Sequence, residues 1–231
     1  MEIARLRDDD PTWFPPLDRA ICDDEIDGLL AVGGDLSCER LLCAYRNAIF
    51  PWYDEAGPIL WWSPDPRAVI FSDAIHVSRS MARLIRRQTF RVTWNQAFEQ
   101  VMQQCAEPRG TQPGTWILPE MIEAYRRLHA AGHAQSCEVW SGEELVGGIY
   151  GVTIGRLFCG ESMFHRQSNA SKLALISVAQ SGRFDVIDCQ FASEHLLSMG
   201  AEMISRDAFL RLLQSPLCVS STSGGKGFDS G

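Results

Sequence analysis

Leu157-Phe158-Cys159-Gly160-Glu161-Ser162-Met163-Phe164 is the stretch that decides the fold. It is short, rich in aromatic and apolar residues, and follows the turn signal Gly155-Arg156, so it predicts a strand. A second predicted strand, Val186-Ile187-Asp188-Cys189-Gln190-Phe191, likewise places polar groups among apolar ones. A charge in a buried strand is costly unless it is paired or used. The carboxylates Glu161 and Asp188 therefore mark a candidate site.

A structural role is the alternative for these carboxylates, because both can pair with arginines at the end of a sheet. Asp188 and Gln190 lie two residues apart on one strand, so their side chains face the same side. Glu161 lies on a separate strand, and we expect it to face the same cleft.

The composition is that of a globular protein, since 45% of the 231 residues are hydrophobic and 22% are charged. No apolar run approaches the ~20 residues that a membrane helix needs. Residues 1–10 are charged and lack the apolar segment of a signal peptide, so we expect a cytoplasmic protein that does not bind membranes. The net charge of −8 argues against a generally basic nucleic-acid-binding protein but allows a local basic face.

The eight cysteines and five histidines show no pattern typical of a metal site or a disulfide framework. No C-x-x-C pair occurs, and Cys43, Cys159 and Cys189 have apolar neighbours, which favours reduced thiols. Two histidines, His129 and His133, are spaced H-x-x-x-H, but the other three are scattered and no cluster of cysteines accompanies the pair, so no metal is expected.

The predicted elements between residues 67 and 213 follow the order β-α-β-α-α-β-β-β-α-β-α. This order indicates an α+β domain around a mixed, largely antiparallel sheet flanked by helices. It resembles the acetyltransferase-like (GNAT) fold, although the R/Q-x-x-G-x-G/A loop that binds coenzyme A there is missing. Pro64-Asp65-Pro66 is the expected domain boundary. We therefore expect a small N-terminal α/β domain over residues 1–66, a larger domain over 67–219 and a disordered tail over 220–231.

A basic helix is expected over residues 77–88, with Ser78 as its cap. One face of this helix carries the arginine stripe, which consists of Arg79, Arg83, Arg86 and Arg87. From Ala74 to Phe98 the sequence contains five arginines and neither Asp nor Glu. A solvated helix face usually mixes both signs of charge, so the stripe favours contact with phosphates.

Tryptophans and prolines crowd into residues 51–66, where rigid aromatic rings offer flat surfaces. We expect Trp61 and Trp62 to belong to a small core. Trp52 lies between a proline and a tyrosine in a loop-like segment, and it is a candidate stacking platform.

Seven motifs in order along the chain resemble those of the leucyl/phenylalanyl-tRNA protein transferase family. They are Gly-Gly-Asp-Leu-Ser (33–37), Ile-Phe-Pro-Trp (49–52), Trp-Trp-Ser-Pro-Asp-Pro-Arg (61–67), Gly-Thr-Trp-Ile (114–117), Leu-Phe-Cys-Gly-Glu-Ser-Met-Phe (157–164), Asn-Ala-Ser-Lys (169–172) and Ile-Asp-Cys-Gln (187–190). Each motif is weak alone, but seven in order at similar spacings are highly specific. Leu173 departs from the family's usual Thr or Val at this position, which alters the expected lining of the pocket.

The resemblance implies an enzyme of the bacterial N-degron pathway. Its donors are Leu-tRNA, Phe-tRNA and Met-tRNA, and its acceptors are proteins with an N-terminal Arg or Lys. The implied reaction is aminolysis of the aminoacyl ester, which needs no cofactor or metal because the ester is already activated. The larger domain is then the catalytic one, and we expect the protein to be a monomer.

Residue roles follow from the same resemblance. It implies that Glu161 holds the amino group of the donor and that Asp188 orients Gln190, which positions the attacking amine. It implies that Trp52 and Trp116 stack on the terminal adenosine, and the arginine stripe is expected to contact the tRNA backbone. The implied aminoacyl pocket consists of Ile149, Phe158, Gly160, Met163, Leu175 and Ile187. Plain core is the alternative for each of them, whereas a methionine suits a pocket that must accept both Leu and Phe.

Three other functions compete with this one. A peptidoglycan-type aminoacyltransferase usually repeats the fold twice, for which 231 residues leave no room. A hydrolase that uses Cys159 or Ser162 with His165 would lack the second glycine of a G-x-S-x-G elbow. A non-catalytic RNA-binding module would explain the arginines and tryptophans, but not the polar groups inside apolar strands.

Overall fold

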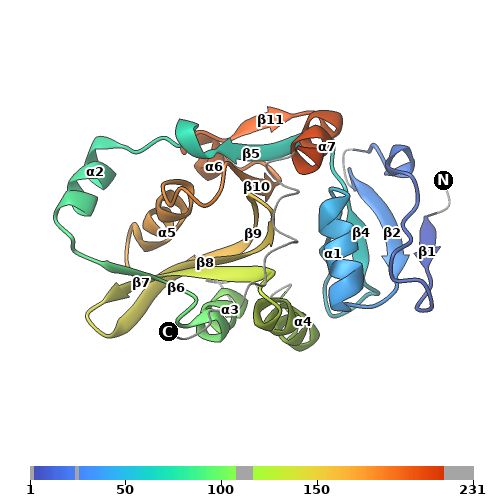
Figure 1. The fold of residues 1–231 in the computed structure, drawn as a ribbon, viewed down its shortest axis with the longest axis horizontal. Coiled ribbons are helices and arrows are strands. Elements are labelled where there is room, and N and C mark those ends of the chain that lie inside the picture. Colours follow the sequence, from blue (N-terminus) through green and yellow to red (C-terminus); the bar gives the residue numbers. More distant parts are fainter. Residues whose placement is uncertain (1–2, 24–25, 108–116, 216–231) are drawn as a thin grey trace, which may run out of the picture.

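A mixed seven-stranded sheet forms the centre of the computed structural model, which describes residues 3–23, 26–107 and 117–215 (Figure 1). Its strands in chain order are β5 (Arg67–Phe71), β6 (Arg91–Trp94), β7 (Ala134–Ser141), β8 (Glu144–Ile154), β9 (Leu157–His165), β10 (Val186–Gln190) and β11 (Glu202–Ile204). Their spatial order is β11-β5-β10-β9-β8-β7-β6. Only the β9–β10 pair is parallel in this sheet, and the other pairs are antiparallel.

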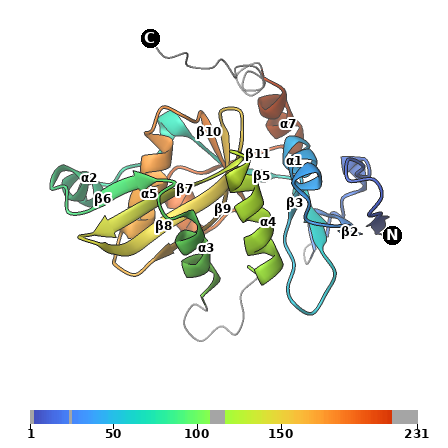
Figure 2. The same ribbon diagram turned by 60° about the horizontal axis from the view of Figure 1, so that its bottom comes forward.

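Helices cover both faces of this sheet (Figures 1 and 2). They are α2 (Arg79–Arg86), α3 (Phe98–Ala106), α4 (Pro119–Ala130), α5 (Ala170–Ala179), α6 (Glu194–Ser198) and α7 (Arg206–Gln214). Helices α3 and α4 pack on one face, whereas α5 packs on the other. Because both faces are covered, the central strands are buried on both sides and read as nearly continuous apolar runs.

Alternation along β9 assigns its side chains to two buried clusters. Leu157 and Cys159 belong to the cluster under α3 and α4, and Phe158 belongs to the cluster under α5. The polar groups of β9 and β10 begin only where these two strands stop pairing. The first half of each strand is thus apolar, and the polar groups are confined to the second half.

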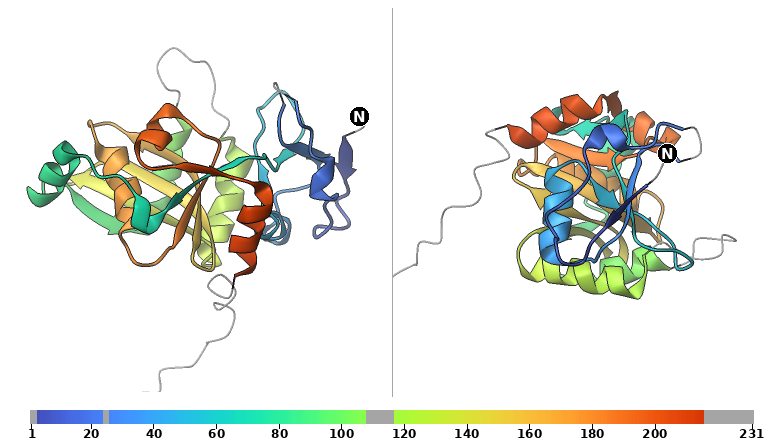
Figure 3. Two further views of the ribbon diagram at one scale, coloured as in Figure 1. Left: turned by 90° about the horizontal axis from the view of Figure 1, so that it is seen from above. Right: turned by 90° about the vertical axis from the view of Figure 1, so that its right-hand side faces the viewer.

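A smaller sheet of four strands lies beside the large one, at the right of Figure 1 and in the two views of Figure 3. Its elements are β1 (Ala4–Leu6), a 3₁₀ turn (Leu17–Arg19), β2 (Leu29–Gly33), α1 (Cys38–Arg46), β3 (Phe50–Pro51) and β4 (Leu60–Trp62). Ser37 caps α1 by accepting a hydrogen bond from the Arg40 backbone. Trp61 and Trp62 are buried, which confirms the expected core around them.

The predicted fold class is confirmed, because the chain forms mixed sheets flanked by helices. The predicted element order has one helix after β10 where the structure has both α6 and α7, and it lacks β11, a three-residue edge strand too short and too exposed to show a pattern. The cap of α5 is Asn169, in a left-handed conformation (φ 71°) without a side-chain bond. The boundary at residue 66 stays a prediction, and the predicted tail lies outside the described residues.

Two β-bulges interrupt the sheet next to each other. The β8–β9 pairing moves from Tyr150↔Ser162 to Gly151↔Gly160, so Glu161 has no partner. The β10–β5 pairing likewise skips Cys189. A Cβ on Gly151 would lie 2.2 Å from the Cys159 carbonyl oxygen, so only glycine permits this close approach. Both bulges lie just beyond the last parallel β9–β10 pair, Asp188↔Cys159.

Candidate active site

A pocket of about 220 Å³ lies where β9 and β10 stop pairing. Ligands of mixed and parallel sheets commonly bind at the carboxyl ends of such strands. Its wall is formed by Ile149, Gly160, Glu161, Ser162, Met163, Leu175, Ile187, Asp188, Cys189, Gln190 and Leu196. The structure therefore brings all three predicted catalytic residues to one pocket, together with five of the six residues predicted to bind the aminoacyl side chain.

Phe158 is the predicted pocket residue that does not line the wall. Its side chain is fully buried, and its ring packs on Phe184 with 5.2 Å between the ring centroids. It belongs to the same buried cluster as Ile149 and Ile187. Phe158 thus forms the core beneath the pocket rather than its surface.

Glu161 is held by two tyrosines that sequence reasoning did not single out as site residues. The Tyr45 hydroxyl donates to Oε1 at 2.7 Å, and the Tyr125 hydroxyl donates to Oε2 at 3.0 Å. The two hydroxyls also contact each other, and because each carries a single proton, all three contacts become hydrogen bonds at once only when Glu161 is protonated and donates. Tyr45 reaches this point from α1 and Tyr125 from α4, so the Glu161 carboxylate on β9 lies between three elements.

Burial sets the protonation of this cluster. It raises the pKa of Glu161 from 4.5 to about 7, although the hydrogen bonds from Tyr45 and Tyr125 act in the opposite direction. Burial and the nearby Glu161 charge also raise the pKa of both tyrosines well above 10. The tyrosines therefore stay hydrogen-bond donors, while Glu161 exchanges its proton near neutral pH.

Asp188 forms a buried, bidentate ion pair with Arg67. The Arg67 Nε and Nη2 atoms donate to the two carboxylate oxygens at 2.9 and 2.8 Å. Burial acts to lower the pKa of Arg67, but the Asp188 carboxylate outweighs it and the pKa lies above its usual value. Arg67 also donates to the Ala48 carbonyl at 3.1 Å. The negative charge of Asp188 is thus balanced by the guanidinium group of Arg67.

Gln190 has a backbone conformation that is uncommon for a residue with a side chain, with φ at +57°. Its backbone N–H donates to the Asp188 Oδ1 atom at 3.0 Å. Asp188 therefore accepts a hydrogen bond from the main chain of Gln190 rather than from its side-chain amide. This contact stabilises the bulged end of β10 and so sets the position from which the Gln190 side chain begins.

Trp52 lies beside this pocket, directly after β3. Its side chain is 43% exposed, and its ring lies 5.6 Å from the ring of Phe191, which follows Gln190. The Trp62 indole N–H donates to the Trp52 carbonyl at 2.6 Å and so fixes the backbone there. An exposed, anchored aromatic face is suited to stacking. The second predicted stacking residue, Trp116, lies outside the described residues.

The arginine stripe lies away from the pocket, on α2. This helix is at the left of Figure 1, on the side of the large sheet opposite to the small sheet. The four arginines of the stripe are exposed, whereas Met81 on the opposite face is buried. Ser78 caps the helix as predicted. Within the ranges that the structure describes, no carboxylate forms an ion pair with the stripe.

Arg67, Tyr45 and Tyr125 are the site residues that sequence reasoning missed. A signal existed for Arg67, because a carboxylate in a buried strand needs a buried cation and Arg67 ends the Trp-Trp-Ser-Pro-Asp-Pro-Arg motif. The tyrosines had no comparable signal, since a tyrosine on an apolar helix face usually belongs to the core.

The geometry disfavours a hydrolase with Cys159 as its nucleophile. The thiol is fully buried, and burial raises its pKa well above 9, so the reactive thiolate does not form. In the described part of the chain, no group of three or more His, Cys, Asp or Glu side chains is placed to hold a metal ion. Among the same residues, no helix has the length and apolar character to cross a membrane.

Comparison with known families decides the assignment. The sequence model described as leucyl/phenylalanyl-tRNA protein transferase matches residues 69–214, and that described as the N-terminal domain of this transferase matches residues 34–65. The chain belongs to this family. It is therefore an enzyme, an aminoacyltransferase.

Relatives support the family over most of the chain. The leucyl/phenylalanyl-tRNA–protein transferase of Ectopseudomonas mendocina is 53% identical over 211 residues, which cover 90% of this chain and 92% of that protein. The one from Pseudomonas aeruginosa is 53% identical over 204 residues, or 87% and 89% of the two chains. Among solved structures, a GCN5-related N-acetyltransferase from Kribbella flavida covers 71% of this chain and 60% of its own, with 9% identity and a TM-score of 0.37.

Proposed function

We propose that the chain transfers Leu, Phe or Met from aminoacyl-tRNA to the α-amino group of an N-terminal Arg or Lys of an acceptor protein. Such a transfer would mark the acceptor for degradation in the cytoplasm by the N-degron pathway, with the enzyme acting as a monomer. The observation that carries the proposal is the single pocket that combines Glu161, Asp188 and Gln190 with an apolar wall.

The pocket suits one amino acid side chain. Its volume of about 220 Å³ lies below the ~300–1,000 Å³ that is typical of pockets for drug-sized ligands. Ile149, Leu175 and Ile187 supply a rigid branched wall, and Met163 supplies an unbranched side chain that can repack. This combination supports a pocket that accepts Leu, Phe and Met but not charged side chains.

The proposed reaction is the attack of the acceptor amine on the ester carbonyl of the donor. A C–N bond forms, the ester C–O bond breaks, and the amine proton leaves together with the ribose oxygen as a hydroxyl. Gln190 positions the amine through its amide oxygen, because a neutral amide is a very weak base. Asp188 keeps Gln190 in place by accepting a hydrogen bond from the Gln190 backbone N–H. Glu161 pairs with the amino group of the donor.

Binding of the donor is proposed to use two further regions. Trp52, with Phe191 beside it, would stack on the terminal adenine, as expected for a single-stranded RNA end. The arginine stripe would contact tRNA phosphates farther from the ester. Trp116 is proposed as a second stacking residue on the basis of its motif alone.

The decisive experiment incubates the protein with radiolabelled Leu-tRNA and a protein with an N-terminal Arg. We expect RNase-resistant, acid-precipitable label, and we expect none when the acceptor's N-terminus is acetylated. Gln190→Ala should lower the single-turnover rate while donor affinity stays near that of the wild type. Transfer at the wild-type rate by a folded Gln190→Ala protein would exclude the proposed role of Gln190.

Met163→Ala tests the pocket. The variant should enlarge it and shift the ratio of Leu to Phe transfer towards Phe, by an amount equivalent to about 1–3 kcal/mol. The measurement is kcat/KM for the two donors, with Met199→Ala as a control because Met199 is buried outside the pocket wall. An unchanged ratio in a folded Met163→Ala protein would remove Met163 from the pocket.

A further inference from the structure

A second, open pocket of about 550 Å³ adjoins the candidate active site, and Met163 lines both. Its wall comes from the end of β9, the loop that follows, the first turn of α5, and α6. Besides Met163, its lining consists of His165, Arg166, Ser168, Asn169, Ser171, Lys172 and His195. We call this surface the cationic groove, since no carboxylate is among these described residues.

The groove holds one cation, Lys172, whose charge no described carboxylate neutralises. Burial lowers the pKa of His195, and the neighbouring Lys172 and His165 lower it further by repulsion, so the neutral imidazole is favoured, which still donates one hydrogen bond. No ion pair joins Lys172 to a carboxylate anywhere in the described ranges. Arg166 differs, because it pairs with Glu107 at 2.6 Å. A half-buried lysine beside two histidines favours an anion as its partner.

The cationic groove and the aromatic pair of Trp52 and Phe191 both adjoin the active-site pocket. Phe191, which contacts Trp52, follows Gln190 directly, and the chain then enters α6. In α6, Leu196 lines the active-site pocket while the preceding His195 lines the groove. An ester seated beside Gln190 therefore lies close to both an aromatic surface and a cationic one.

We propose that the cationic groove binds the phosphate groups of the 3′-terminal nucleotides of the donor RNA, with Lys172 and His195 as the contacting residues. This inference rests on the proposed function. The phosphates of an RNA donor necessarily lie within one or two nucleotides of its ester, next to the active-site pocket. The acceptor is a poor occupant, because its N-terminal Arg or Lys carries the same charge as the groove.

A matched pair of minimal donors tests the proposal. Leucyl-adenosine carries no phosphate, and leucyl-adenosine 5′-phosphate adds one. For the wild type we expect kcat/KM to be about tenfold higher with the phosphate, as for one charge-assisted hydrogen bond. Lys172→Gln and His195→Gln should bring this ratio close to one, and Lys172→Arg should retain most of it.

Arg211→Gln is the matched control, because Arg211 is an exposed cation on α7 that lines neither pocket. It should leave the phosphate ratio unchanged. A ratio of one in the wild type, or an unchanged ratio in folded Lys172→Gln and His195→Gln proteins, would overturn the proposal. Melting temperatures of all variants show whether they are folded.

Chemical labelling gives a readout that does not depend on transfer. Lys172 and Lys226 are the only lysines in the sequence, so an amine-reactive reagent and mass spectrometry can follow each of them. A hydrolysis-resistant leucylamido-adenosine 5′-phosphate should protect Lys172, whereas the analogue without phosphate should not. Equal protection by both analogues, or protection by inorganic phosphate alone at the same concentration, would count against a site for donor phosphates.

The two proposals fail in different ways. If neither Leu-tRNA nor a minimal donor supports transfer by the wild type, the proposed function fails, and the labelling of Lys172 still decides the groove. If Leu-tRNA supports transfer but the phosphate ratio is one, only the assignment of the groove fails.

Discussion

Glu161 is a buried carboxyl group whose protonation changes near neutral pH. Since its pKa is raised from 4.5 to about 7, the folded protein holds this proton more tightly than the unfolded chain. The resulting stabilisation is fully present below about pH 4.5 and is lost as the pH rises through about 7. A shift of this size corresponds to about 3 kcal/mol as an order of magnitude.

Glu161→Gln removes this titration. We expect the free energy of unfolding of the variant to depend less on pH than that of the wild type between about pH 4.5 and pH 8. The free energy of unfolding of the variant, relative to that of the wild type, should therefore be higher at the upper end of this pH range than at the lower end. Urea unfolding at several pH values measures the difference, and parallel pH profiles for the two proteins would contradict it.

The Arg67–Asp188 pair offers a second test at the scale of single residues. Arg67→Met leaves Asp188 buried without its cation, which should cost about 3–5 kcal/mol of stability. Adding Asp188→Asn should recover part of that loss, because the orphaned charge is then gone. The control is Arg126→Met, which breaks an exposed ion pair with Glu123 and should cost less than about 1 kcal/mol. Equal losses of stability for the two arginine variants would show that the buried ion pair contributes no more to stability than the exposed one.

Helix α2 shows how one element can combine a packing face with an exposed basic face. Its buried Met81 attaches it to the cluster under α5, while the arginine stripe faces solvent. Changing all four arginines of the stripe to Glu should weaken tRNA binding strongly and reduce the dependence of binding on salt.

Transfer from leucyl-adenosine by this α2 variant should stay near that of the wild type, because the stripe lies away from the pocket. Affinity for tRNA at several salt concentrations and transfer from both donors give the comparison. A variant that loses leucyl-adenosine activity as completely as tRNA activity would show that the stripe supports the fold instead.

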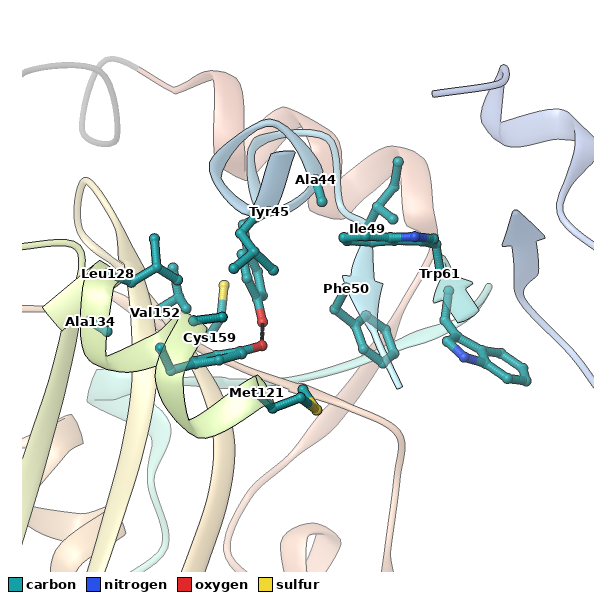
Figure 4. Close-up of a cluster of buried hydrophobic side chains, with 14 of the residues drawn as sticks. Ala44, Tyr45, Ile49, Phe50, Trp61, Met121, Leu128, Ala134, Val152 and Cys159 are labelled. Atoms are coloured by element: carbon teal, nitrogen blue, oxygen red, sulfur yellow. Dashed lines mark hydrogen bonds between the residues drawn. The ribbon is translucent and has the colours of Figure 1, made fainter. Parts of the chain in front are cut away.

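At the scale of the whole molecule, one buried cluster joins the small sheet to the large one. It includes Trp61 and Tyr45 from the elements of the small sheet, and Tyr125 and Tyr150 from those of the large sheet (Figure 4 shows a part of it). The hydrogen bonds of Tyr45 and Tyr125 to Glu161 cross the same boundary. We therefore expect both sheets to unfold in a single cooperative transition.

Tyr45→Phe tests this coupling. Loss of the hydroxyl removes one donor from a buried carboxylate, and we expect a cost of about 1–3 kcal/mol. Tryptophan fluorescence and far-UV circular dichroism should report the same lowered midpoint. Tyr53→Phe is the control, because its hydroxyl makes only a long 3.4 Å contact with Glu120. Two separate transitions in the wild type would show that the parts are independent.

Much of this protein is determined by its sequence alone. The helices and most strands follow from local periodicity and capping, as the cap of α2 by Ser78 shows. The seven motifs identify the family, and the polar residues of two apolar strands indicate the candidate site. These features were readable because each depends on residues that are close together in the chain.

Only the tertiary structure decided how that site is built. Tyr45 lies 116 residues from Glu161 in the chain, and Arg67 lies 121 residues from Asp188, so no local pattern links them. The bulges at Glu161 and Cys189 depend on how neighbouring strands pair, and the raised pKa of Glu161 depends on what buries it. Burial and strand register are properties of the packed chain, and for this reason they became visible only in three dimensions.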